Sequence, residues 1–197
     1  MTHKIPNPIA FVKRGYDQIA ATYHAQRNLL DNRDLLEEFA RLLAPRGRVL
    51  DIGCGAGVPV MKFLVESGCT VTGIDIAWEM LALTKKHVPG VQLFEMNMIH
   101  LAFRAQSFDG LTAFYTIFHV PRAYPRQVFA MFSRVLKPGG VMLISLGWSD
   151  WEGTEEFHGT EMYWSHYPAE TSLSLVAQVG FTLLRSEPRY PGDGTHC

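Results

Sequence analysis

The sequence has little cysteine, no long apolar run and almost no net charge. Its 197 residues include three cysteines without CxxC spacing, so neither a disulfide framework nor a cysteine zinc site is expected. No stretch reaches the ~18 consecutive apolar residues of a spanning helix, and the N-terminus lacks a secretory apolar run. Eighteen Lys and Arg against nineteen Asp and Glu argue against nucleic acid as a bulk partner. These absences favour a cytoplasmic protein that binds neither nucleic acid nor membranes.

What is present is a regular alternation of predicted strands and helices. With 47 % hydrophobic residues, the chain can bury a sizeable core. Helices at 9–26 and around 35–43 precede strands at 48–52, 70–74, 91–94, 110–114, 141–146 and 181–185, and further helices are expected at 58–66, 78–87, 121–136 and 168–180. This alternation predicts an α/β fold with a doubly wound, mostly parallel sheet. We expect a single domain over 1–197, with N-terminal helices within 8–44 and a lid-like loop at 147–168.

A glycine-rich turn follows the first predicted strand. Residues 49–57 read VLDIGCGAG, and Gly53, Gly55 and Gly57 allow a tight turn and a close approach of the backbone to a ligand. Asp75 ends the next strand, twenty residues beyond Gly55. Nucleotide-binding sheets place a carboxylate at this position, on the ribose hydroxyls. The combination predicts a nucleotide site at the ends of these strands.

The details of the turn favour one class of nucleotide. The dinucleotide pattern GxGxxG fails, because Val58 and Val60 occupy the sixth positions counted from Gly53 and Gly55. Asp51, at the loop entry, would repel a pyrophosphate but could hold a cationic amino group. One carboxylate facing an amino acid end and another facing a ribose suit a nucleoside that carries a methionine.

Five segments resemble the class I S-adenosylmethionine-dependent methyltransferases, in the small-molecule branch called type 11. They are YDQIAATY, VLDIGCGAG, VTGID, SFDGLTAFYTIFHV and RVLKPGGVMLIS, and together they extend over nearly the whole chain. The resemblance implies a Rossmann-like methyltransferase fold. It also implies S-adenosyl-L-methionine as the cofactor and S-adenosyl-L-homocysteine as the product.

The same resemblance assigns residues to the cofactor. The implied set is Tyr16, Tyr23, Asp51, Gly53, Gly55, Gly57, Asp75, Ile76, Asn97, Met98 and Ala113. Asn97 stands where the family usually has Asp facing adenine, and its amide oxygen can still accept a hydrogen bond. Phe114 follows Ala113, so only backbone contact is expected there. Two alternatives stay open: Asp51 as a brace of the loop, and the two tyrosines as core packing.

An aromatic and acidic segment lies between the predicted fifth strand and the last helix. Residues 147–168 hold six aromatic and five acidic side chains, with no Lys or Arg. Trp148, Trp151, Trp164 and Tyr167 are therefore predicted to bind the substrate. The acceptor would be a flat aromatic molecule or, through Glu152 and Glu156, a cationic amine. The alternative is that the rings fill a small satellite core while the acids are solvated.

Methyl transfer is expected to be an in-line displacement in which the protein supplies positioning and excludes water. A hydroxyl or ammonium acceptor must also lose a proton. His119, after the fourth strand, and His166, with Tyr163 nearby, are the predicted catalytic residues. Packing roles remain open for both histidines. No metal site is predicted, because the spacing of His158 and His166 does not match a zinc pair.

Three functions compete at this level. The first is methyl transfer to a small organic acceptor, and the second is a catalytically silent binder of the cofactor that stabilises a partner. The third, a nicotinamide-dependent oxidoreductase, is disfavoured by the glycine spacing. The oligomeric state is not readable from the sequence.

The C-terminal end of the sequence suggests an incomplete sheet. The family sheet has seven strands, and residues 181–185 would be the sixth. A turn signal, GDG, follows shortly before Cys197. We therefore expect the seventh strand to be missing or truncated, leaving the strands at 141–146 and 181–185 with unpaired edges.

Overall fold

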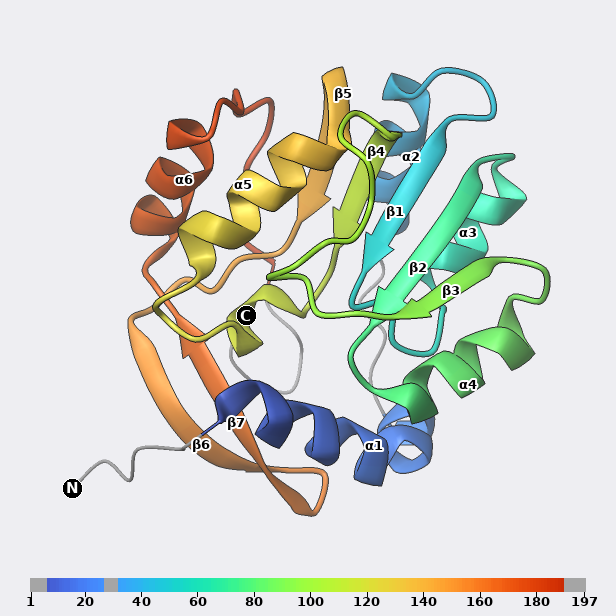
Figure 1. Ribbon diagram of the computed structural model, residues 1–197. Coiled ribbons are helices and arrows are strands. Elements are labelled where there is room, and N and C mark those ends of the chain that lie inside the picture. The colour runs from blue at the N-terminus through green and yellow to red at the C-terminus, as the bar shows by residue number, and fades with distance from the viewer. Residues whose placement is uncertain (1–6, 27–31, 190–197) are drawn as a thin grey trace.

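The computed structural model describes residues 7–26 and 32–189, which build a parallel sheet flanked by helices (Figure 1). The sheet has five strands in the order β3-β2-β1-β4-β5. Their bounds are β1 Arg48–Ile52, β2 Thr70–Asp75, β3 Gln92–Glu95, β4 Phe108–Ala113 and β5 Leu136–Ile144. All four pairings are parallel, which confirms the predicted doubly wound α/β fold.

Helices cover both faces of this sheet. They are α1 Pro8–Gln26, α2 Arg33–Leu42, α3 Val60–Glu66, α4 Trp78–His87, α5 Pro125–Val135 and α6 Ala169–Gln178, with a 3-10 turn, η1, at Ile117–His119. In Figure 1, α2 and α3 lie behind the sheet and α5 lies in front of it. The strand order reverses between β1 and β4, and such switch points open a crevice at the carboxyl ends of parallel strands.

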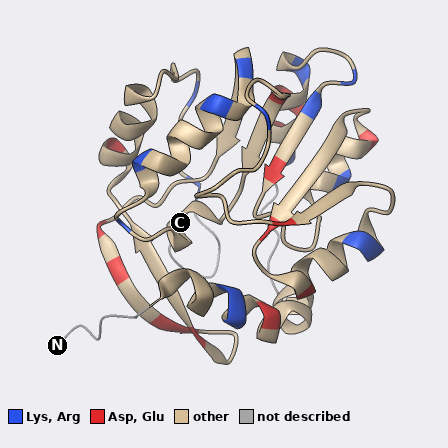
Figure 2. Cartoon of the chain, in the orientation of Figure 1, with Lys and Arg blue, Asp and Glu red and all other residues tan. Residues whose placement is uncertain are grey.

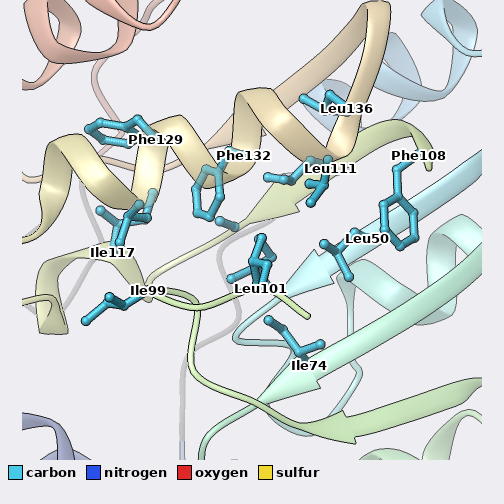
Figure 3. Close-up of a cluster of buried hydrophobic side chains, with 14 of the residues drawn as sticks. Leu50, Ile74, Ile99, Leu101, Phe108, Leu111, Ile117, Phe129, Phe132 and Leu136 are labelled. Carbon is cyan, nitrogen blue, oxygen red and sulfur yellow. The ribbon is translucent and has the colours of Figure 1, made fainter. Parts of the chain in front are cut away.

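Consecutive residues of β1 point to opposite faces of the sheet and pack in two different hydrophobic clusters. Leu50 packs in the cluster that contains Phe129 and Phe132 of α5 (Figure 3), whereas Val49 packs with Met61 of α3. Both sides of the strand are buried, as the near-continuous apolar sequence of a central parallel strand predicts.

Residues 147–168 differ from the predicted irregular loop. They contain an antiparallel hairpin of β6 Trp151–Phe157 and β7 Thr160–His166, which forms a second sheet. His158 and Gly159 connect the strands with φ values of 49° and 83°, and a two-residue turn of this kind requires positive φ at both positions. The hairpin packs on α1, where a Cβ on Gly15 would lie 2.7 Å from the Met162 methyl carbon.

The prediction of a strand at 181–185 is wrong. These residues form neither helix nor strand, and the described sheet ends at β5. The short apolar run was the basis of the prediction, yet Leu183 and Leu184 are 59 % and 73 % exposed. The GDG turn at 192–194 lies outside the described residues.

Smaller differences concern element boundaries. Helix α5 begins at Pro125 rather than at residue 121, because residues 121–124 form a turn in which the N–H of Tyr124 donates to the Pro121 carbonyl at 2.9 Å. Strand β5 begins at Leu136, earlier than the predicted residue 141, and includes the KPGG segment. Among the described residues, no helix combines the length and the apolar character needed to cross a membrane.

Candidate functional site

The main cleft lies at the carboxyl ends of β1 to β4, and α1 lines its opposite side. Many of the predicted cofactor residues come together there. They are Tyr16, Tyr23, Asp51, Gly53, Gly55, Asp75, Ile76, Asn97 and Met98, and His119 lines the same cleft. Figure 2 shows acidic positions at the ends of β1 and β2, where the cleft begins.

The glycine loop between β1 and α3 has positive φ at all three of its glycines, and Gly53 and Gly55 shape its cleft side. Gly53 has φ +63°, and a Cβ there would lie 2.2 Å from the hydroxyl oxygen of Thr116. Gly55 has φ +54°, and a Cβ there would meet no protein atom within 4 Å. Gly53 therefore lets the loop approach the segment after β4, whereas Gly55 leaves the cleft side of the loop open.

Asp75, at the end of β2, braces the glycine loop. The backbone N–H of Gly55 donates to its Oδ2 at 3.0 Å, and the N–H of Ala77 donates to its Oδ1 at 2.9 Å. Burial raises the pKa of the Asp75 carboxyl to about 6, although these backbone donors lower it. Each carboxylate oxygen has two lone pairs, so both can accept a further hydrogen bond from a ligand.

Asp51 is a second buried carboxyl, at the end of β1. It is 3 % exposed, and the hydroxyl of Thr112 donates to its Oδ1 at 2.7 Å. Burial raises the pKa of Asp51 to about 7, and the negative charge of Asp75 adds to the rise. A ligand cation would offset this burial and favour the ionised form.

The cleft continues past the end of β3. Asn97 and Met98 line it there, and Ile76 lines it after β2. The backbone N–H of Ile99 donates to Asn97 Oδ1 at 3.0 Å, which fixes the amide. This side of the cleft thus offers apolar surface and one oriented amide, a combination that suits a planar base carrying an amino group.

His119 links three elements around the cleft. Its Nδ1 lies 2.7 Å from the carbonyl oxygen of Tyr163 on β7, and its Nε2 lies 2.8 Å from the hydroxyl of Tyr16 on α1. A carbonyl only accepts, so Nδ1 carries the hydrogen and Nε2 accepts from Tyr16. Burial lowers the pKa of His119 to about 4, and the ring packs on Trp164 at a centroid distance of 4.4 Å. The imidazole is therefore neutral at physiological pH.

Two predicted cofactor residues do not line the cleft. Ala113 is fully buried in β4, and its carbonyl accepts from the N–H of Ser145 at 3.1 Å. Gly57 instead faces α4, where a Cβ would lie 2.8 Å from Thr84 Cγ2. Both residues shape the strands and loop rather than the surface that faces a ligand.

The other two predicted catalytic residues also lie outside the lining of the cleft. The hydroxyl of Tyr163 donates to Glu152 Oε1 at 2.7 Å, and burial raises its pKa to about 12. His166 is buried, with its Nδ1 at 2.5 Å from the carbonyl oxygen of Ser149. It lines a separate small pocket beside Ser165 and Ser172.

The four predicted substrate residues do not line the cleft either. Trp148 and Trp151 are exposed, and Trp164 is buried in the aromatic cluster between the hairpin and α1. The ring of Tyr167 packs against the guanidinium of Arg122 at 4.7 Å. The hairpin aromatics thus mostly form a satellite core or remain at the surface.

The two hairpin acids that suggested an amine site, Glu152 and Glu156, have partners outside the cleft. Glu152 accepts from Tyr163 and pairs with Arg122 Nε at 3.3 Å. Glu156 accepts from the backbone N–H of Gly159 at 2.6 Å. Neither residue lines the cleft, so the structure gives no support for the cationic amine that these acids suggested.

Sequence reasoning missed several lining residues. Ile9 and Val12 line the cleft together with Tyr16, and a spacing of three and four residues places them on one face of α1. Thr116 lines it after β4 and packs against Gly53. The helical period and the position after a strand end were the available signals for these residues.

Comparison with known proteins agrees with this geometry. Residues 50–144 match the family model described as "Methyltransferase domain". An uncharacterized methyltransferase from Synechocystis sp. is 30 % identical over 151 residues, which cover 73 % of this chain and 70 % of that protein.

Two further similar proteins have more specific names. The ubiquinone biosynthesis O-methyltransferase of Paracidovorax citrulli is 36 % identical over 104 residues, or 50 % of this chain and 42 % of that protein. The chain therefore matches less than half the length of this relative. The crystal structure of Burkholderia thailandensis 1,6-didemethyltoxoflavin-N1-methyltransferase, with bound 1,6-didemethyltoxoflavin and S-adenosylhomocysteine, superposes with a TM-score of 0.71 at 19 % identity, covering 100 % of this chain and 89 % of that one.

Proposed function

Because the chain belongs to the class I S-adenosylmethionine-dependent methyltransferases, we propose that its main cleft holds the cofactor for in-line methyl transfer to a small organic acceptor. The observation that carries the proposal is the glycine loop with Asp51 and Asp75 beside it in one cleft. Two similar proteins, named for ubiquinone biosynthesis and for a toxoflavin precursor, support a small-molecule acceptor.

The residues present fit the cofactor. Gly55 leaves open space where a Cβ would otherwise project, so a ligand can approach the loop closely. Asp75 would accept hydrogen bonds from the ribose hydroxyls, and Asp51 would face the cationic methionine end. Asn97 would accept from the adenine amino group through its oriented amide oxygen.

The protein's part in the reaction is positioning and exclusion of water. When bound, S-adenosylmethionine supplies a methyl group on a sulfonium, which leaves as a neutral thioether. Tyr16 and Tyr23 of α1 face the strand ends across the cleft, where they would shield the reacting groups from solvent. Positioning in a dry site supplies most of the rate enhancement for a displacement with a good leaving group.

Thermal shift followed by a transfer assay tests this function. We expect S-adenosylmethionine and S-adenosylhomocysteine to raise the melting temperature and NAD to leave it unchanged. Transfer of a labelled methyl group to a panel of phenols, amines and carboxylates then identifies the acceptor class. A rise in melting temperature with NAD, and with neither S-adenosylmethionine nor S-adenosylhomocysteine, would contradict the proposal.

The raised pKa of Asp51 predicts a pH dependence of cofactor binding. The folded pKa of about 7 exceeds the ordinary value near 3.8, so the protonated form stabilises the free protein, and stability falls as pH rises between these values. The cationic amino group of the ligand selects the carboxylate, and we expect S-adenosylhomocysteine affinity to rise about 15-fold from about pH 6 to 7.5, most of it through Asp51. Calorimetric titration of the wild type and Asp51→Asn measures this.

Asp51→Asn provides the control for that pH dependence. The variant should retain only the small rise, about twofold, expected from Asp75 with its pKa of about 6. An equally steep rise in the variant would show that another group controls the titration.

A further inference from the structure

The part of the cleft beyond the cofactor residues follows from the strand order. Strands β2, β1 and β4 are neighbours in the sheet, about 4.8 Å apart. Their carboxyl ends place Asp75, then Asp51, then Phe114 along one edge of the cleft. If the cofactor occupies the ends of β2 and β1, the next surface along the edge is formed by residues 114–121 and the facing side of α1. Tyr16 and His119 are on this surface.

This surface has almost no charge. Among the described residues that line the cleft, the carboxylic acids are Asp51 and Asp75, and neither Lys nor Arg is present. Beyond these two acids, the lining is formed largely by apolar side chains such as Val12, Phe114 and Val120. An anionic acceptor would lose its hydration there without gaining a cationic partner.

The Tyr16–His119 pair has a fixed hydrogen-bond direction. The Nδ1–H of His119 donates to the Tyr163 carbonyl, so the unprotonated Nε2 accepts a hydrogen bond from the Tyr16 hydroxyl. Toward a ligand, the Tyr16 oxygen can therefore offer only an acceptor lone pair. A molecule that meets this oxygen must present a hydrogen-bond donor.

We propose that the methyl acceptor is an uncharged, largely apolar hydroxyl compound, of the phenol class, whose O–H donates to Tyr16 and loses its proton through Tyr16 to His119. This proposal rests on the proposed function. As the acceptor oxygen bonds to the methyl carbon, the carbon–sulfur bond breaks and its electron pair stays on sulfur. The hydroxyl proton passes to Tyr16, and the Tyr16 proton passes to Nε2 of His119. One positive charge thus moves from sulfur to the imidazole, and atoms and charge balance.

The surroundings of His119 are consistent with a transient proton carrier. At neutral pH the ring is uncharged, so Nε2 has its lone pair available to the Tyr16 hydroxyl. Trp164 and Phe118 pack on the ring, and the Tyr163 carbonyl holds its Nδ1 side. Because burial disfavours the imidazolium, the proton is released again when the product leaves.

A first experiment uses three phenols that differ in charge. Calorimetry measures the binding of methyl 4-hydroxybenzoate, 4-hydroxybenzoate and tyramine to the complex with S-adenosylhomocysteine, with methyl benzoate as the analogue without a hydroxyl. We expect the neutral ester to bind at least about tenfold more tightly than each of the others. Preference for the anion or the amine, or no binding of any phenol at millimolar concentration, would overturn the proposal.

A second experiment uses variants of the pair. Tyr16→Phe should lower kcat for methyl 4-hydroxybenzoate by about 100-fold and erase the affinity advantage over methyl benzoate. His119→Gln keeps an acceptor for the Tyr16 hydroxyl but cannot take its proton, so binding should persist while kcat falls similarly. Tyr124→Phe, on an exposed tyrosine beside α5, is the matched control and should change neither quantity.

The outcomes separate this proposal from the proposed function. Unchanged kcat in Tyr16→Phe, with normal S-adenosylhomocysteine binding, contradicts the relay alone. Wild-type protein that binds neither S-adenosylmethionine nor S-adenosylhomocysteine contradicts both. A loss of kcat in Tyr16→Phe that is matched by an equal loss of S-adenosylhomocysteine affinity would assign Tyr16 to the cofactor and overturn its role as proton acceptor.

Discussion

Replacing Asp75 by alanine should weaken the binding of S-adenosylhomocysteine by at least about 100-fold. The carboxylate would hold the ribose, and it also accepts the N–H groups of Gly55 and Ala77. Hydrogen bonds to a charged group contribute roughly 1.5–3 kcal/mol each, so the loss of two such bonds from the ribose hydroxyls accounts for the expected loss of affinity. Calorimetric titration measures the affinity, and thermal unfolding reports how far the loop is destabilised.

Asp109→Ala is the matched control for this experiment. Asp109 also accepts a backbone N–H, that of Arg48 at 2.9 Å, but it is the second residue of β4 and lies at the opposite end of the strands. The same substitution there should leave the affinity within about twofold of the wild type. Equal losses in both variants would mean that general destabilisation, rather than a ribose contact, causes the effect.

Gly55→Ala should also weaken cofactor binding, for a different reason. The new Cβ would meet no protein atom within 4 Å, so it would project into the open space that we propose for the cofactor. The positive φ of Gly55 adds a cost of about 1–2 kcal/mol to folding. We therefore expect a modest fall in melting temperature together with a loss of affinity of about 30-fold or more.

Gly68→Ala separates these two effects. Gly68 has φ +86° and no neighbour within 4 Å of a Cβ, but it ends α3 outside the cleft. Gly68→Ala should lower the melting temperature as much as Gly55→Ala does, but it should leave the cofactor affinity unchanged. Gly53→Ala should lose more stability than either, because its Cβ would collide with Thr116. If Gly68→Ala and Gly55→Ala lowered affinity equally, the open space at Gly55 would not be the cofactor site.

The strands that build the cleft could be predicted because their signals are local. The apolar run of β1, the glycine turn after it and the acid that ends β2 each depend on neighbouring residues. Parallel strands then bring Asp51 and Asp75 to one edge as a matter of topology. For this reason, the grouping of the glycine loop, Asp51 and Asp75 in one cleft was largely predictable.

The part of the cleft around Tyr16 and His119 could not be predicted in the same way. Tyr16 and His119 are 103 residues apart, and no sequence pattern relates them. The hairpin was missed because its turn uses His158 with a positive φ, which few residues other than glycine adopt. Its aromatic side chains resemble a binding loop in composition, but Trp164 and Phe157 pack against each other and α1 instead.

The packing of α1 against the hairpin has a consequence for the order of folding. The first half of α1 is synthesised before the hairpin, yet Gly15 lies against Met162 of β7 and Tyr16 is hydrogen-bonded to His119. Such contacts between distant parts of the chain form only after both have been synthesised, and closing long loops slows folding. The second half of α1 can dock on α4 earlier, through Ala20. The wall of the cleft that contains Tyr16 and His119 is therefore completed only after β7 has been synthesised, although α1 precedes β7 in the chain.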